Sequence, residues 1–221
     1  MPKRGRRPGL DRQRIAEVAI GLADAGGLGA VALQRVAETM GVTKMALYSY
    51  VAGKAELVAL MADTAVGEPP ASESASKSWR QRLVVLSLVL YERFRQHPWV
   101  VEATTGARHT GPNEVAWLER FLTPLRDTRL TGAERLDLTV TLIGHVRSIA
   151  MQAAVADDRP EHVMAAGLMS LVDDRRDRFP MVAATLESIE PETEDHALRF
   201  GLDLILSGAE HLDAQRAGVR C

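Results

Sequence analysis

The stretch LQRVAETMGVTKMALYSYVAGKAEL, residues 33–57, holds two short apolar-periodic segments joined by a single glycine. The apolar residues of the first segment recur at the spacing of one helical face: Leu33, Val36, Ala37 and Met40. Gly41 follows at once, and glycine tolerates the left-handed conformation that commonly ends a helix. Thr43, a good N-cap residue, opens the next segment. The pattern predicts two short helices joined by a tight turn.

The second of these helices is crowded with polar and basic side chains. Its inward position is Leu47, which leaves the other side chains near the outer surface: Thr43, Lys44, Met45, Tyr48, Ser49 and Tyr50. Hydroxyl and ammonium groups there can reach phosphates and base edges of DNA. We therefore predict a helix-turn-helix, with the second helix in the major groove and the first bracing it. Packing of a tyrosine into the core is the alternative for Tyr48 and Tyr50.

Two flanking helices complete the first 66 residues. Asp11 can cap a helix that ends at Gly26 and Gly27, and GKAELVALMADTAV, residues 53–66, resumes the helical periodicity. Lys54 stands at the start of that last helix, where its charge and the free backbone amides can meet a phosphate. We expect a DNA-binding domain over residues 1–66.

The composition favours an all-α protein that stays in the cytoplasm. Hydrophobic residues make up 46% of the chain but aromatic residues only 5%, a balance that suits packed helices better than sheets. The most apolar run, residues 83–91, is too short to cross a bilayer, and the charged amino terminus lacks the apolar core of an export signal. The single cysteine, Cys221, predicts neither a disulfide nor a structural zinc site.

Charge is unevenly distributed along the chain. Residues 1–56 contain nine Lys or Arg and five acidic residues, so they carry +4, whereas the remainder carries −6. A basic N-terminal segment followed by an acidic remainder indicates an N-terminal domain that binds a polyanion, because phosphate contacts supply most nonspecific affinity for DNA. The alternative is a basic tail that only aids solubility.

A second, larger unit follows the Pro- and Ser-rich loop at residues 67–78, and we expect a helical domain over residues 79–221. Its predicted helices lie at residues 78–96, 99–107, 113–129, 132–157, 160–178 and 194–215. Proline residues separate several of them, since proline cannot continue a preceding helix.

Residues 11–62 resemble the DNA-binding domain of the TetR-type transcriptional repressors. The similarity lies in the order of helix, glycine, helix, "GV", "LY" and K-x-x-L at the family spacing. It implies that Tyr48 and Lys54 touch the DNA backbone, while Lys44, Met45 and Ser49 lie on the groove-facing helix. Gln34, on the preceding helix, is added to the predicted DNA contacts.

The resemblance also identifies an arm and two departures. The segment KRGRRP looks like the basic arm that some family members lay into the minor groove, which implicates Arg4, Arg6 and Arg7. Ala32 stands where the family usually has a capping Ser or Thr, and Tyr50 stands where His is common.

Residues 79–215 resemble the ligand-binding and dimerisation domain of the family, closest to its tetracycline-repressor subgroup. That implies a small-molecule effector held in a mostly apolar pocket. The candidate lining residues are Trp99, Trp117, Phe121, His145, Met151, Gln152 and Met164, each of which could instead be ordinary core. His109 without a carboxylate cluster does not indicate a metal site, and we expect neither a metal nor a cofactor.

Two apolar stripes predict a dimer interface. They comprise Leu138, Leu142 and Ile149 on one long helix, and Leu198, Leu202, Ile205, Ala209 and Leu212 on the last helix, with heptad spacing in the second stripe. The family forms a four-helix bundle from two such helices of each chain. Closure of the monomer core is the alternative.

Together these features predict a ligand-responsive repressor that binds a pseudo-palindromic double-stranded operator as a homodimer. No nucleophile, glycine-rich loop or metal spacing supports an enzyme. A helical adaptor that does not bind DNA is the alternative function.

Overall fold

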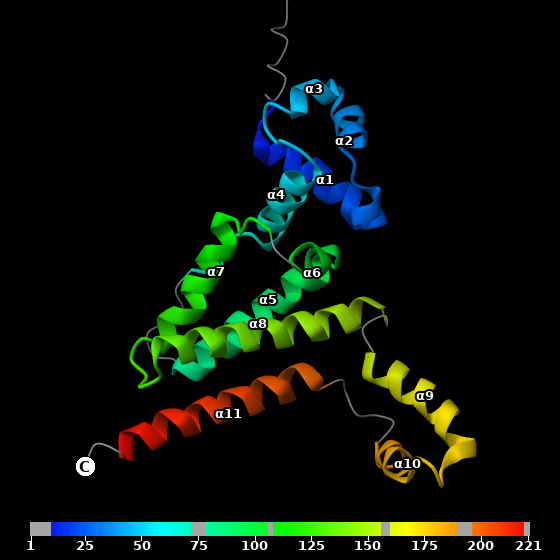
Figure 1. Cartoon of the computed structure of the whole chain (residues 1–221), viewed down its shortest axis with the longest axis vertical. Helices are drawn as coiled ribbons and strands as arrows, with labels where there is room; N and C mark the ends of the chain where they lie inside the picture. The colour runs from blue at the N-terminus through cyan, green and yellow to red at the C-terminus, as the bar shows by residue number, and fades with distance from the viewer. Residues whose placement is uncertain (1–9, 72–77, 106–107, 156–159, 190–195, 219–221) are drawn as a thin grey trace, which may run out of the picture. The chain divides into compact units, whose positions relative to one another are not determined.

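The computed structural model describes residues 10–71, 78–105, 108–155, 160–189 and 196–218, and the secondary structure in these ranges is entirely helical (Figure 1). The chain forms two compact units, Met1–Pro124 and Leu125–Cys221. In the described ranges, no helix combines the length and apolar character needed to cross a membrane.

The first unit begins with the four helices that we call the head, residues 10–66. They are α1 (Arg12–Gly26), α2 (Leu33–Met40), α3 (Lys44–Leu47) and α4 (Lys54–Val66), with a short 3-10 turn at Leu28–Ala30 after α1. Three more helices belong to this unit: α5 (Trp79–Gln96), α6 (Trp99–Ala103) and α7 (Pro112–Leu122). Helix α4 packs on α1 and also on α5, α6 and α7, so it joins the head to the rest of the unit.

The second unit contains α8 (Gly132–Val155), α9 (Pro160–Val172), α10 (Pro180–Glu187) and α11 (Ala197–Gly218). Helices α8 and α11 pack side by side, and α9 packs on α10 (Figure 1). Arg216 of α11 pairs with Glu134 in the first turn of α8, and the Thr131 amide donates to the same carboxylate over 2.7 Å. These interactions fasten the two long helices at one end.

The head is built around fully buried apolar side chains from all four of its helices. The largest of them have no exposed surface: Ile15, Val36, Leu47, Leu57 and Met61. Capping fixes the helix starts, because Asp11 accepts from the Arg14 amide over 2.8 Å and Thr43 accepts from the Ala46 amide over 3.3 Å. Gly41 ends α2 with φ of 67°, a left-handed value that glycine adopts without a Cβ penalty.

Several helix boundaries differ from those expected. The segment predicted as helical to Tyr50 is an α-helix only to Leu47, and the helix predicted over 113–129 ends at Leu122. The predicted helix over 160–178 ends at Val172 and continues as a short 3-10 turn. Helix α10 was not predicted, because we used proline only as a residue that ends helices. Pro180 instead occupies the first turn of α10, where its missing N–H costs nothing.

Helix α2 starts without a side-chain cap, which leads to a stability prediction. Ala32 has the extended backbone of an N-cap, with φ of −138° and ψ of 141°, yet no side chain accepts from the first turn. Ala32→Ser should therefore raise the free energy of unfolding by about 1 kcal/mol. Chemical denaturation measures the change. Ala184→Ser, at an exposed position inside α10, is the control and should give no gain. An unchanged or lower stability for Ala32→Ser would contradict the cap assignment.

Candidate nucleic-acid interface

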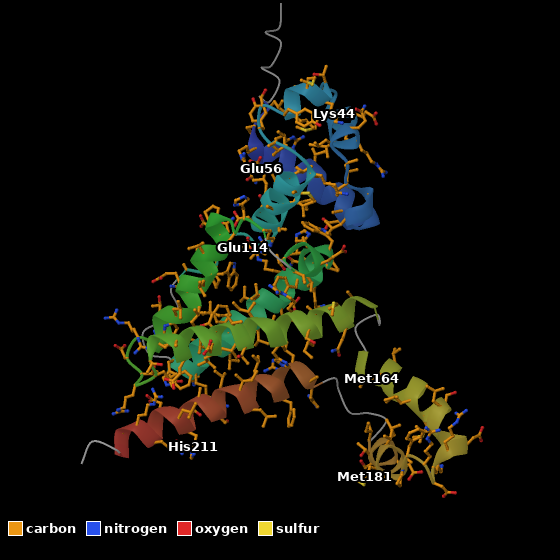
Figure 2. All side chains as sticks on the ribbon, in the orientation of Figure 1. Lys44, Glu56, Glu114, Met164, Met181 and His211 are labelled. Carbon is orange, nitrogen blue, oxygen red and sulfur yellow. The ribbon has the colours of Figure 1, made fainter. Side chains whose placement is uncertain are left out.

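Helix α3 presents one inward side chain and a polar outer face. Leu47 is completely buried, while Thr43, Lys44 and Ser49 are exposed, Met45 is 73% exposed and Tyr48 is 41% exposed. Lys44 lies on α3, at the end of the head (Figure 2). Tyr50 is half-buried and its carbonyl accepts from Arg12, so the two tyrosines differ in accessibility. The outer face of α3 thus offers donors, an ammonium and one apolar thioether to an incoming surface.

The cations of this face are only weakly engaged by the protein itself. The Lys44 ammonium lies 5.7 Å from the centre of the Tyr48 ring, a cation–π contact that orients both side chains. Lys54 is exposed at the start of α4, and its Nζ donates to the Leu28 carbonyl over 3.4 Å. Gln34 is exposed on α2 and donates to Glu38 over 2.7 Å. The predicted arm residues Arg4, Arg6 and Arg7 lie outside the described residues.

An ion pair that was not predicted holds the loop after α3. Arg12 of α1 pairs with Glu56 of α4 over 2.9 Å, and Glu56 also accepts from the Ala52 amide over 2.7 Å. The pKa of Glu56 is lowered, most strongly by the hydrogen bond from the Ala52 amide and next by the hydrogen bond from Arg12. The loop that leads into α4 and Lys54 is thereby fixed to α1.

Asp24 connects the head to the start of α6. Its Oδ1 accepts from the Trp99 indole over 2.7 Å and lies 2.8 Å from Nδ1 of His97. Asp24 stands near the carboxyl end of α1, where a negative charge opposes the helix dipole, so these hydrogen bonds offset an otherwise unfavourable placement. Trp99, predicted to line a ligand pocket, is 5% exposed and uses its only donor here.

Asp63 connects the head to the start of α7. It is 6% exposed, and its Oδ1 accepts from the Glu114 amide over 3.0 Å, in the first turn of α7. Gly111 lies against this carboxylate so closely that a Cβ at that position would come within 2.2 Å of Oδ1. Burial raises the pKa of Asp63, and the hydrogen bonds from Glu114 and Asn113 partly oppose that rise.

The remaining aromatic candidates for a ligand pocket also lie in the first unit. Trp117 is 3% exposed and donates through Nε1 to the Gly67 carbonyl over 2.9 Å. Phe121 is fully buried, with its ring centre 6.2 Å from that of Trp117. Both side chains contribute to the core of this unit.

A groove of about 960 Å³ lies in the first unit, between α4 of the head and the segment that leads into α7. Its lining residues include Arg12, Glu56, Ala59, Leu60, Asp63 and His109. None of the seven predicted ligand-contacting residues is among its lining residues. Figure 2 labels Glu56 on α4 and Glu114 on α7, the helices that border this groove.

The other predicted ligand contacts lie in the second unit. His145 packs against Gly201 of α11, where a Cβ would clash with the imidazole ring, and its Nε2 lies 3.0 Å from the Leu198 carbonyl. Met151, Gln152 and Met164 are exposed in this unit. His145 therefore has a partner on the neighbouring helix before any ligand is considered.

The predicted dimer residues divide between two environments. Leu142, Leu202 and Ala209 are buried within a single chain, whereas the half-buried members are Leu138, Ile149, Leu198 and Ile205. Leu212 is exposed. The outer faces of α8 and α11 instead present apolar side chains that sequence spacing did not identify: Leu136, Val140, Phe200 and Leu204. Phe200 and Leu204 are four residues apart, as expected for one helical face.

Across the described residues, no group of three or more His, Cys, Asp or Glu side chains could hold a metal ion. The geometry defines an all-helical DNA-binding protein of the helix-turn-helix class, with an exposed recognition helix. The family model described as "Tetracyclin repressor-like, C-terminal domain" matches residues 70–212. The chain belongs to the TetR family of transcriptional regulators and is not an enzyme.

Curated relatives agree with this assignment. The HTH-type transcriptional repressor DrrR1 of Streptomyces coeruleorubidus is 31% identical over 237 residues, covering 98% of this chain and 83% of that repressor. An HTH-type transcriptional regulator of Saccharopolyspora erythraea is 24% identical, covering 91% of this chain and 85% of that protein. The resemblance inferred from the helix-turn-helix motif is confirmed.

Solved structures confirm the all-α fold. Apo ActR from Streptomyces coelicolor superimposes with a TM-score of 0.79 at 23% identity, covering 92% of this chain and 96% of ActR. ActR in complex with actinorhodin gives a TM-score of 0.79 at 23% identity, covering 91% and 97% of the two chains. TetR-Q116A from Acinetobacter baumannii in complex with minocycline gives 0.68 at 18% identity, covering 93% and 99%.

The buried carboxylate of Asp63 leads to a prediction about pH. A carboxyl group whose pKa is raised by folding stabilises the protein most below its unfolded pKa, near 3.8, and this contribution is lost as pH rises through the folded pKa. Asp63→Asn keeps an oxygen acceptor but does not ionise. The stability of the variant relative to the natural protein, measured by urea denaturation, should therefore increase as pH rises above the unfolded pKa near 3.8.

Glu134→Gln is the control of opposite sign. The hydrogen bond from the Thr131 amide, and next the one from the Thr131 hydroxyl, lower the pKa of Glu134. The contribution of Glu134 to stability is therefore present at high pH and lost as pH falls. A stability difference for Asp63→Asn that stays constant as pH rises would contradict the assigned role of burial.

Proposed function

We propose that this protein is a cytoplasmic repressor that binds a pseudo-palindromic operator as a homodimer and is released by a small molecule. Residues 1–66 would form the DNA-binding domain, and residues 79–221 the effector-binding and dimerisation domain. The observation that carries the proposal is the outer face of α3, where exposed Lys44, Met45, Tyr48 and Ser49 stand on or directly after a helix held by buried Leu47.

The side chains of this face divide by chemistry. Lys44, Met45 and Ser49 stand on or directly after α3 and would meet base edges in the major groove. The backbone contacts would come from Gln34, Thr43, Tyr48, Tyr50 and Lys54, because hydroxyls, amides and ammonium groups all donate to phosphates. Exposed Lys54 at the start of α4 supports this role, since helix N-termini favour anions. The arm residues Arg4, Arg6 and Arg7 would follow the minor groove.

The apolar outer faces of α8 and α11 support the proposed homodimer. Phe200 is 65% exposed and Leu204 is 60% exposed on one face of α11, and Val140 is 59% exposed on α8. A two-fold interface would bury each stripe against the same stripe of a second copy. Two copies of α3 related by that axis would require two half-sites, hence the pseudo-palindrome.

The effector would be a largely apolar small molecule that favours the conformation with low DNA affinity. ActR has been solved with actinorhodin, and TetR-Q116A with minocycline, which supports a ligand of comparable character here. Of the predicted lining residues, Met151, Gln152 and Met164 are exposed within the second unit and are the candidates to contact it. Gln152 remains the candidate for an orienting hydrogen bond, because its amide is exposed and its Nε2 makes only a 3.4 Å contact with Ser148.

Lys54→Ala tests DNA binding and its mode. Loss of one phosphate contact should weaken binding to all DNA sequences and reduce the slope of log affinity against log salt by about one. Fluorescence anisotropy at several salt concentrations measures this slope. Lys44→Ala is the comparison, because loss of a base contact should change which operator variants are preferred. A natural protein without a steep negative slope would indicate the adaptor function instead.

Phe200→Glu combined with Leu204→Glu tests the dimer. Each unpaired charge buried at a two-fold interface should cost on the order of 3 kcal/mol, so the double variant should sediment as a monomer. Both side chains are exposed in the single chain, so its own core should be unaffected. Val115→Glu, at a 54% exposed position of α7, is the control and should remain dimeric. An intact dimer in the double variant would place the interface elsewhere.

A further inference from the structure

The head exposes its large apolar side chains very selectively. Among described residues 10–66, the large hydrophobic residues that are exposed are Met45, at 73%, and Tyr48, at 41%. Tyr48 carries a hydroxyl and lies under the Lys44 ammonium, so its ring already has a partner. Met45 is left as an apolar side chain directed outward from the helix that faces DNA in the proposed function.

The position of Met45 is well defined by its neighbours. It is the second residue of α3, between the Thr43 cap and the fully buried anchor Leu47. The N-terminal residues of a recognition helix are those that contact base edges. Met45 also has three rotatable bonds and a polarisable sulfur, so it can adapt to a methyl-sized surface.

Chemistry narrows what this side chain can recognise. A thioether donates no hydrogen bond, so it gains little from phosphates or from the donor and acceptor edges of the bases. The apolar feature of the major groove is the C5-methyl group of thymine. The same methyl position exists on 5-methylcytosine, which otherwise pairs as cytosine does.

We infer that Met45 reads a pyrimidine C5-methyl group in each operator half-site. The inference rests on the proposed function, because it requires α3 to lie in the major groove. It adds a specific consequence, namely that the protein distinguishes thymine from uracil, and 5-methylcytosine from cytosine, at one position of each half-site. Lys44 next to it would read a neighbouring acceptor such as guanine O6 or N7.

The test removes the methyl group and leaves base pairing intact. Operator duplexes are first selected from a random library by the natural protein, and each thymine is then replaced in turn by deoxyuridine. Burial of one methyl-sized group corresponds to about 0.8 kcal/mol, so a single replacement in one half-site should weaken binding about fourfold. At that position, a C–G pair should show the same ratio between 5-methylcytosine and cytosine.

Variants assign the effect to Met45. Met45→Ala should bind thymine and uracil operators equally, whereas Met45→Leu, which stays apolar, should retain a preference for the methyl group. Ser49→Ala is the matched control on the same face and should keep the full fourfold ratio. Because Met45 is exposed, its replacement should leave thermal stability unchanged.

Two outcomes would overturn the inference while leaving DNA binding in place: a natural protein indifferent to every deoxyuridine replacement, or a Met45→Ala variant with an undiminished methyl preference. Failure to select any duplex would instead contradict the proposed function, and the inference would fall with it.

Discussion

The burial of Leu47 is the interaction on which the DNA-binding surface depends. Helix α3 has only four residues, too few to be stable in isolation, because helix nucleation costs more than one turn returns. Leu47 is completely buried, and the cap at Thr43 and the left-handed Gly41 fix where the turn begins. Everything displayed on the outer face of α3 is thus positioned by tertiary packing rather than by helix propensity.

Two carboxylates then join the head to the rest of its unit. Asp24 of α1 binds the Trp99 indole at the start of α6, and Asp63 of α4 binds the first turn of α7. Both carboxylates lie near the carboxyl ends of their own helices, where the helix dipole disfavours a negative charge. Their value therefore lies in the contact that each one makes with another element. A movement of α6 or α7 would act on the head through these hydrogen bonds.

The spacing of residues within short segments was sufficient to predict the helix-turn-helix. Gly41, Thr43 and Leu47 identified the helix-turn-helix because caps, turns and apolar periodicity are encoded within a few residues. The links made by Arg12 to Glu56, Asp24 to Trp99 and Asp63 to Glu114 join residues 44, 75 and 51 positions apart, and no periodicity signals such pairs. Heptad spacing likewise identified an apolar stripe on α11 but could not tell the inward side of the helix from the outward one. Leu202 faces inward and Phe200 faces out.

In the proposed function, α3 and the start of α4 meet DNA. Amide chemical-shift mapping on addition of a selected operator duplex tests it most directly, with a scrambled duplex of equal length and charge as the control. We expect the largest operator-specific changes within residues 43–54, and above all at Lys44, Met45 and Ser49. Operator binding that leaves residues 43–54 unperturbed while other amides shift would contradict this proposal.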